Sequence, residues 1–234
     1  MMQTMLDTLN RELPGLGIDL GEGVKKTLCD FGCAVVKQNE VMNLTAITEP
    51  DRVAKLHLVD SLTLLTVADL HGKSVIDVGC GAGFPGVPVK IACPGMKLTL
   101  LDSLGKRMNW LETVLPGLGV EAQCVTARAE EAVAQRREKY DFATSRAVAR
   151  LNILLELTAP FVKVGGAVLA MKGTAAAEEL EESQNAIAKL GLKLEKVLEF
   201  PMDGTAHSVI VLRKVKPTPA LYPRRYAKIK QQPL

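Results

Sequence analysis

Apolar side chains recur with two different periods along this chain of 234 residues. Up to residue 72 they fall three or four positions apart, as at Leu6, Leu9 and Leu13, which is the period of an amphipathic helix. From Lys73 onward they gather in short runs separated by longer amphipathic segments, which is typical of strands that alternate with helices. We therefore expect residues 1–72 to form a helical cap in front of an α/β domain.

The short apolar runs predict strands near residues 74–79, 97–102, 121–126, 140–145 and 165–171, and helices near 86–93, 104–115, 128–137, 151–163 and 175–190. Such alternation predicts a parallel, doubly wound sheet with a Rossmann-like arrangement. Two further runs, 193–200 and 207–213, are separated only by residues 201–206. Because so short a link cannot hold a crossover helix, these runs must form an antiparallel hairpin. We expect seven strands, the last one antiparallel.

A glycine-rich turn joins the first strand to the first helix of this sheet. Gly79, Gly81 and Gly83 alternate along it, and glycines allow positive φ angles and close approach of a ligand to the main chain. Asp102 ends the second strand, where a carboxylate can bind two ribose hydroxyls. The pattern predicts a site for a nucleotide-like cofactor, with Gly79, Gly81 and Asp102 among its residues.

The same turn also fits the spacing G-x-G-x-x-G over residues 81–86, which is found in nicotinamide and flavin enzymes. Pro85 and Pro88 argue against a dinucleotide, because each removes a backbone N–H from the helix start that would hold a pyrophosphate. An adenosyl sulfonium ligand has no phosphate and loses nothing there. By analogy of fold, a reversed last strand is also found in the sheet of S-adenosylmethionine-dependent methyltransferases. A nicotinamide-dependent oxidoreductase remains the alternative enzyme.

Positive charge is concentrated at the end of the chain, although the net charge is only +3. Residues 204–234 hold seven Lys and Arg and no carboxylate. This composition suits a polyphosphate partner such as RNA, or else a solubilising, partly disordered terminus. Lys106, Arg107, Arg146, Arg150 and Lys172 lie near predicted strand ends and are further candidates for holding RNA phosphates.

Five cysteines, an odd number without the spacing of a disulfide framework, indicate a reduced, cytoplasmic protein. Cys29 and Cys33 lie four residues apart, but no histidine or second cysteine pair lies close to them in sequence, so we expect no metal. No apolar run reaches the length of roughly 18 residues that a membrane helix needs. We expect no membrane contact.

Several motifs along nearly the whole chain resemble the RsmG (GidB) family of 16S ribosomal RNA guanine-N7 methyltransferases. They include the stretches DVGCGAGFPG at 77–86, TLLDSLGKR at 99–107, RAEE at 128–131, SRA at 145–147, MKG at 171–173 and, in the cap, Asn43–Thr45, His57 and Asp60–Ser61. The resemblance implies that S-adenosyl-L-methionine is the donor. It implies methylation of N7 of guanine 527, in the 530 loop of 16S rRNA. The expected partner is 16S rRNA or the small ribosomal subunit.

The resemblance also implies cofactor contacts at Gly79, Phe84, Ala129, Glu130 and Arg146. Together with the helical pattern of the first residues and the charge of the last ones, it leads us to expect a cap over 1–72, a methyltransferase domain over 73–214 and a basic tail over 215–234. We expect a monomer. No catalytic residue is assigned, because guanine N7 already presents a lone pair, and Arg146 is the nearest candidate. The alternative outside enzymes is a non-catalytic RNA-binding factor for ribosome assembly.

Overall fold

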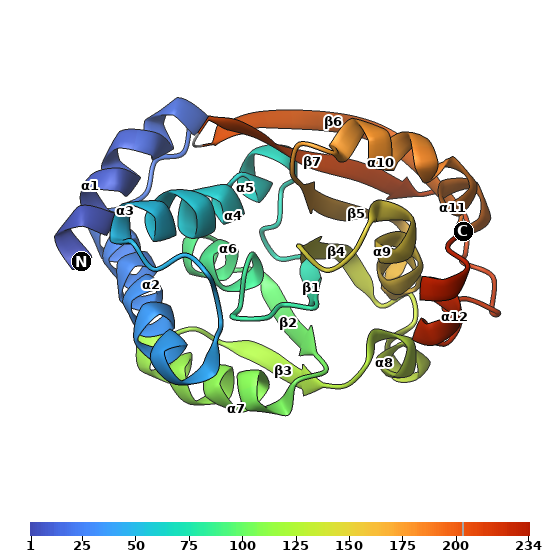
Figure 1. Cartoon of the computed structure of the whole chain (residues 1–234), viewed down its shortest axis with the longest axis horizontal. Helices are drawn as coiled ribbons and strands as arrows, with labels where there is room; N and C mark the ends of the chain where they lie inside the picture. Colours follow the sequence, from blue (N-terminus) through green and yellow to red (C-terminus); the bar gives the residue numbers. More distant parts are fainter. Residues whose placement is uncertain (203) are drawn as a thin grey trace.

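A seven-stranded sheet forms the centre of the molecule in a computed structural model, which describes residues 1–202 and 204–234. The strands are β1 (Ser74–Val78), β2 (Lys97–Asp102), β3 (Ala122–Thr126), β4 (Tyr140–Arg146), β5 (Val162–Lys172), β6 (Leu192–Met202) and β7 (Thr205–Lys214). Their order is β3-β2-β1-β4-β5-β7-β6 (Figure 1). β7 runs antiparallel to β5 and β6, and the other pairings are parallel. The predicted α/β fold and hairpin are confirmed; residue 203 of the link lies outside the described residues.

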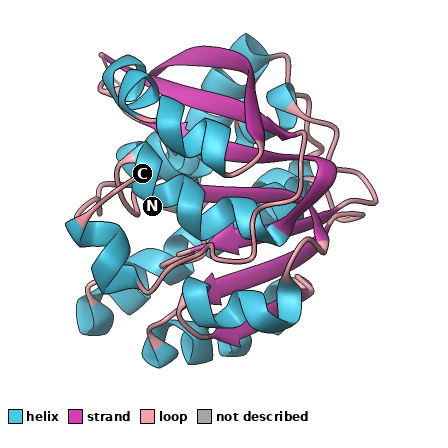
Figure 2. Cartoon of the chain, turned by 90° about the vertical axis from the view of Figure 1, so that its right-hand side faces the viewer, coloured by secondary structure: helices cyan, strands magenta, loops and turns pink. Residues whose placement is uncertain are grey.

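Helices cover both faces of this twisted sheet (Figures 1 and 2). One face carries α1 (Met2–Glu12), α2 (Glu22–Met42), α3 (Pro50–Val53), α4 (Asp60–Leu62), α5 (Leu64–Val67), α6 (Gly86–Ala92) and α7 (Gly105–Val114). The other carries α8 (Ala129–Arg136), α9 (Leu151–Thr158), α10 (Ala176–Glu182), α11 (Gln184–Lys189) and α12 (Tyr226–Gln231). The result is a three-layer sandwich with the two termini on opposite sides of the sheet (Figure 1).

Two hydrophobic clusters, one on each side of the sheet, hold these layers together. On the cap side Met5, Leu28 and Leu58 belong to the same buried cluster as Leu98 and Leu169 of the strands. Burial of each such side chain stabilises the folded state by about 1.5 to 3 kcal/mol, because its apolar surface is removed from water. The helical cap therefore shares its core with the sheet. The division into cap, central domain and tail stays a prediction.

Two of the predicted helices differ from the expected ones: one ends early and the other is divided in two. The helix expected over 151–163 stops at Thr158 and a 3₁₀ turn follows at Ala159–Phe161, because Pro160 cannot continue an α-helix. The helix expected over 175–190 divides at Ser183, whose hydroxyl donates to the Glu179 carbonyl at 2.6 Å. Side-chain bonds of this kind compete with the regular helix ladder.

The basic tail packs against the rest of the protein. Tyr222 and Ile229 are buried. The Arg224 guanidinium donates to both oxygens of Glu156, at 2.8 and 2.6 Å. The interpretation of the tail as a partly disordered terminus is therefore wrong, because its apolar and charged groups are both used in packing.

No helix within residues 1–202 and 204–234 is long and apolar enough to cross a membrane. The same residues contain no cluster of three or more side chains that could hold a metal ion.

Candidate functional site

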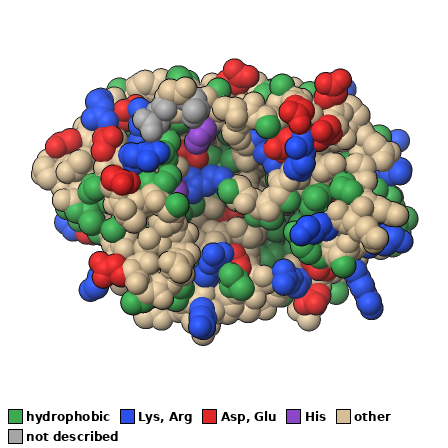
Figure 3. Space-filling view, viewed as in Figure 1, with side chains coloured by type: hydrophobic (Ala, Val, Ile, Leu, Met, Phe, Trp, Pro, Cys, Tyr) green, Lys and Arg blue, Asp and Glu red, His purple; other side chains and the backbone are tan. Residues whose placement is uncertain are grey.

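Two cavities open at the carboxyl ends of the parallel strands and share one wall. The smaller, of about 400 Å³, is lined among others by Gly79, Asp102 and Glu130. The larger, of about 720 Å³, opens beside Arg146, and Figure 3 shows the molecule hollowed at the centre of this face. Residues 147–148, directly after β4, line both cavities. Ligands bind at this edge in open α/β sheets.

The glycine turn follows β1, and its first glycine, Gly79, lines the smaller cavity. Gly79 has φ +72° and Gly81 has φ +57°, angles that residues with a side chain rarely adopt. A Cβ atom on Gly79 would lie 2.5 Å from Cγ2 of Val148, whereas one on Gly81 would meet only Arg107, at 3.9 Å. Gly79 therefore lets the wall between the cavities approach the turn.

The N–H groups of this turn are directed into the protein. Six of them have intramolecular acceptors: Gly79 and Cys80 donate to Leu101 O, Gly81 to Asp102, Gly83 and Phe84 to Cys80 O, and Gly86 to Asp77. Burial raises the pKa of the Asp77 carboxyl to about 7, and the bond from Gly86 opposes this rise only in part. A pyrophosphate needs free N–H groups at a helix start, so this turn is unsuited to a dinucleotide.

Asp102 ends β2 and is 8% exposed. Its Oδ2 accepts from Gly81 N at 3.0 Å and its Oδ1 accepts from Leu104 N at 2.9 Å. Each carboxylate oxygen has room for a second hydrogen bond. Two hydroxyls of a ribose are suitable donors for these positions, so the group fits an adenosyl ligand.

Ala129 and Glu130 begin α8 and line the same cavity. Oε1 of Glu130 accepts from Tyr226 N at 3.3 Å, and Tyr226 also lines the cavity. The sequence analysis missed this contribution of the tail, because nothing in the pattern of residues 215–234 indicates where that segment folds back. The structure brings Gly79, Asp102, Ala129 and Glu130 together, with Gly81 bonded to Asp102.

Phe84 lies on the other side of the wall. It is 6% exposed and packs 5.3 Å from the Phe31 ring and 4.7 Å from the His57 ring, measured between centroids. The Arg146 guanidinium lies over its face at 5.2 Å, a favourable cation–π contact. Phe84 therefore supports the larger cavity and does not line the smaller one.

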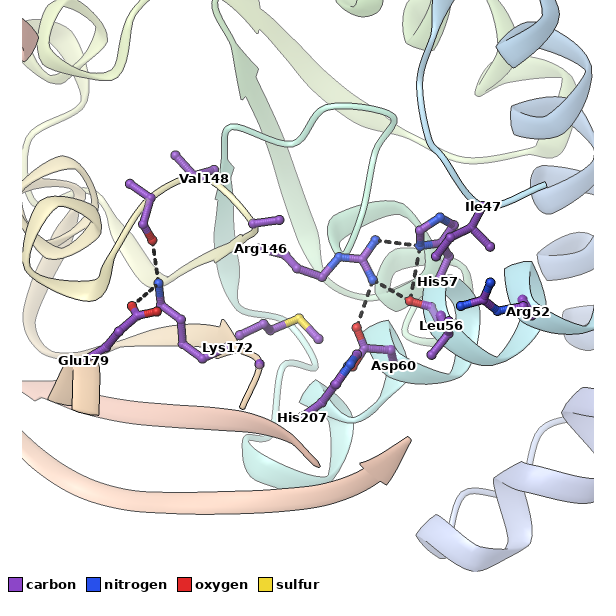
Figure 4. A pocket seen from close by; sticks show the side chains of 14 residues that line it. Ile47, Arg52, Leu56, His57, Asp60, Arg146, Val148, Lys172, Glu179 and His207 are labelled. Carbon is purple, nitrogen blue, oxygen red and sulfur yellow. Dashed lines mark hydrogen bonds and ion pairs between the residues drawn. The ribbon is translucent and has the colours of Figure 1, made fainter. Parts of the chain in front are cut away.

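Arg146 is held by the cap. Its Nη1 donates to Leu56 O and to Asp60 Oδ2, both at 2.9 Å, and its Nη2 contacts His57 Nδ1 at 3.2 Å (Figure 4). The second Asp60 oxygen pairs with His207 Nδ1 at 2.9 Å. Burial opposes ionisation of Asp60, but the bond from His207 and the charge of Arg146 outweigh it and lower the pKa of the carboxyl.

His57 is neutral in this network. Burial first, and then the charge of Arg146, lower the pKa of its imidazole to about 4. Nδ1 lies 3.2 Å from Arg146 Nη2, which only donates, and 3.2 Å from Leu56 O, which only accepts, so each neutral tautomer satisfies one of the two. Nε2 lies 2.8 Å from Thr45 Oγ1, a hydroxyl that can donate or accept. The cap motifs at Thr45, His57 and Asp60 thus converge on Arg146, an arrangement that their sequence separation concealed.

We expect the substitution His57→Gln to flatten the acid side of the stability profile. The pKa of about 4 lies below the ordinary value of 6.5, so the unfolded chain binds the proton more tightly and stability falls as the pH drops below 6.5. Urea unfolding at about pH 7.5 and pH 5 should show about 2 kcal/mol less acid destabilisation in the variant.

His207 provides the internal control for this comparison. The bond to Asp60 raises its pKa, which stabilises the fold on the acid side, and this contribution is present in both proteins. An equal loss of stability in wild type and variant would show that His57 does not titrate in this range.

Four of the expected phosphate-binding residues already have carboxylate partners. Arg146 pairs with Asp60, Arg107 with Asp102 at 3.8 Å, Arg150 with Glu178 and Glu182, and Lys172 with Glu179. These carboxylates offset part of the positive charge on the four side chains, and their contact with RNA phosphates stays a prediction.

A family model described as GidB, rRNA small subunit methyltransferase G, matches residues 25–208. The ribosomal RNA small subunit methyltransferase G of Alkaliphilus metalliredigens is 43% identical over 225 residues, covering 94% of each chain. That of Lactobacillus johnsonii is 41% identical over 232 residues, covering 96% of this chain and 97% of the relative.

The chain belongs to the rRNA small subunit methyltransferase G family. Its fold is also similar to that of M. jannaschii TYW2 in complex with AdoMet, with a TM-score of 0.56, 13% identity, and coverage of 68% of this chain and 76% of that chain. The expected Rossmann-like methyltransferase sheet is confirmed. The cofactor contacts expected within the family at Gly79, Phe84, Ala129, Glu130 and Arg146 stay predictions.

Proposed function

We propose that this protein transfers a methyl group from S-adenosyl-L-methionine to N7 of a guanine in 16S rRNA, at position 527 in the 530 loop. The observation that carries the proposal is the pair of cavities that meet at residues 147–148. One has the carboxylate and open backbone that fit an adenosyl group, and the other has room for a base. Methyl transfer requires donor and acceptor on two sides of one contact point.

Positioning supplies the catalysis. When bound, the donor supplies a methyl group on a positively charged sulfur. The N7 lone pair forms the new bond to the methyl carbon, and the two electrons of the broken carbon–sulfur bond stay on sulfur. We assign Gly79 and Gly81 to the approach of the donor to the main chain, Asp102 to its ribose, and Ala129 and Glu130 to its base. In-line alignment supplies several kcal/mol, up to about 7 to 11 in favourable intramolecular models.

Arg146 lines the larger cavity beside the contact point, and Phe84 packs against its guanidinium. Both are kept here as predicted contacts of the donor. Arg146 uses three of its five N–H groups on Leu56, Asp60 and His57, so two donors are left for a ligand. No proton leaves guanine during attack from N7, and the site accordingly needs no general base.

Labelled methyl transfer tests this function against both alternatives. We expect methylation of 16S rRNA or small subunits from a strain that lacks the gene, with the label mapped to guanine N7. Calorimetry should show binding of S-adenosyl-L-methionine and none of NAD. Binding of NAD alone would support the oxidoreductase, and donor binding without transfer to any naked or assembled RNA would support the assembly factor.

Three cations of the tail are the best candidates for RNA phosphates. Arg225, Lys228 and Lys230 are exposed and flank Tyr226, which lines the smaller cavity. By contrast, Arg213, Lys214 and Arg224 are ion-paired within the protein. The basic tail therefore presents part of its charge beside the cofactor site.

Reversal of Arg225, Lys228 and Lys230 to glutamate should weaken RNA binding and reduce its salt dependence. Three phosphate contacts contribute about 2 to the slope of log K against log salt for single strands. Fluorescence titration of an RNA at several salt concentrations measures this slope. The matched control reverses three exposed lysines just before or at the amino ends of β1, β2 and β4, namely Lys73, Lys97 and Lys139. Equal slopes of log K against log salt in the two triple variants would show that these three residues of the tail do not contact RNA phosphates.

A further inference from the structure

The larger cavity contains one carboxylate with an unused oxygen. Two acidic residues line it, Asp60 and Glu179. Asp60 uses Oδ1 on His207 and Oδ2 on Arg146. Glu179 uses only Oε2, which accepts from Leu151 N at 2.7 Å and lies 2.8 Å from Lys172 Nζ. Among the described residues, none donates a hydrogen bond to Glu179 Oε1.

Glu179 is held rigidly although it lies on a surface helix. Its side chain is 14% exposed and that of Lys172 is 8% exposed. Lys172 also donates to Ala149 O, so the pair ties α10 to the end of β5 and to the loop after β4. Figure 4 shows this pair across the cavity from His57 and Asp60, with Arg146 between the two groups. A carboxylate fixed in this way is preorganised to accept from a ligand.

The chemistry of a purine ring identifies the ligand group that such an oxygen accepts. The Watson–Crick edge of guanine carries two adjacent donors, N1–H and the N2 amino group, whereas adenine has an acceptor at N1. Enzymes that modify a base read this edge after the base has left the stack. A carboxylate oxygen with two free acceptor positions matches guanine and repels the adenine N1.

We propose that Glu179 is the specificity-determining residue of the acceptor site, and that its Oε1 accepts from N1–H and the N2 amino group of the target guanine. The proposal rests on the proposed function. It also has a kinetic consequence. Methyl transfer to N7 moves the positive charge of the donor onto the guanine ring, which strengthens its N1–H as a donor. The bond to Glu179 is therefore stronger in the transition state than in the ground state, which is the condition for a gain in kcat.

Inosine in place of the target guanosine tests this contact, because inosine keeps N7, O6 and N1–H but lacks the N2 amino group. The two RNAs differ at that position alone, and each is assayed by labelled methyl transfer. A hydrogen bond to a charged group contributes enough to predict that wild type loses about tenfold or more in kcat/KM on the inosine RNA. Equal rates on the two RNAs would overturn the proposal without any variant, provided that guanine N7 is methylated.

The variant Glu179→Gln, assayed on the same guanosine and inosine RNAs, tests whether the preference for guanosine depends on this carboxylate. Its amide oxygen can keep the bonds to Leu151 and Lys172, which turns the amide nitrogen toward the donors of guanine. We expect a loss in kcat on the guanosine RNA, a guanosine-to-inosine ratio close to one, and unchanged affinity for S-adenosyl-L-methionine by calorimetry. If the variant slows both RNAs by one common factor, Glu179 only supports the fold and the proposal fails.

Glu178→Gln is the matched control, because Glu178 is the neighbouring carboxylate on α10, pairs with Arg150 and does not line the cavity. It should keep the wild-type ratio. A change in ratio equal to that of the Glu179 variant would assign the effect to α10 as a whole and overturn the proposal. Failure of the proposed function itself would appear differently, as the absence of N7 methylation by wild type.

Discussion

The variant Gly79→Ala should bind S-adenosyl-L-methionine about 10- to 100-fold more weakly than wild type. Two costs combine at this position. A side chain at φ +72° is strained by roughly 1 to 2 kcal/mol, and the new Cβ would lie 2.5 Å from Val148, so the variant relaxes by shifting the turn, and binding of the donor must reverse that shift. Val148 must move, and it forms the wall that the two cavities share. Each 1.4 kcal/mol of lost binding energy lowers affinity tenfold. Calorimetry of the purified variant measures the loss.

Gly81→Ala separates the two costs. Gly81 also has a positive φ, but a Cβ there would have open space apart from Arg107 at 3.9 Å. We therefore expect a smaller loss in this variant. The double variant Gly79→Ala/Val148→Ala, compared with Val148→Ala alone, should recover part of the affinity because the clash is removed. Wild-type affinity in Gly79→Ala would show that the turn does not shape the donor site.

Replacing Arg224 by alanine should destabilise the whole protein by about 3 to 5 kcal/mol, the usual cost of leaving one member of a buried ion pair without its partner. Glu156 is fully buried, and Arg224 provides three donors to it: its backbone N, Nε and Nη2. The substitution removes the last two. Urea unfolding monitored by circular dichroism measures the free energy of unfolding. The control is Arg225→Ala, which replaces an exposed neighbour and should keep the stability of wild type.

The double variant Glu156→Gln/Arg224→Ala distinguishes the charge from the lost packing. With no carboxylate left inside, we expect it to be more stable than Arg224→Ala alone. If instead both variants are equally unstable, then the cost belongs to the packing of the tail and not to an uncompensated charge.

The architecture was readable from the sequence because it follows from local patterns. The six-residue link at 201–206 sufficed to predict the reversed strand, and the runs ending at Val78 and Asp102 placed the glycine turn at the carboxyl edge. These features depend on chain length, alternation and backbone freedom. The same reasoning placed Gly79 and Asp102 together, since carboxyl ends of neighbouring parallel strands meet at one edge. Ala129 and Glu130 entered only through the family resemblance.

The directions of the side chains and the pairings between residues far apart in the chain could not be predicted from the sequence. Phe84 lies in the same turn as Gly79, yet its ring points to the cap, because Phe31 and His57 provide an apolar contact there. Arg146 depends on Asp60, which in turn binds His207 from a strand 147 residues further along the chain. Such contacts arise only when the cap and the hairpin close over the same strand end.

The thin wall at Val148 has a practical meaning for inhibitor chemistry. Residues 147–148 border both cavities, so an adenosine analogue and a purine joined by a short linker can occupy both at once. Such a bisubstrate compound gains from effective concentration, because the second half binds without a new loss of translational freedom. Its purine half would add contacts with the residues of the larger cavity, such as Arg146 and Glu179, which the adenosine half alone does not make.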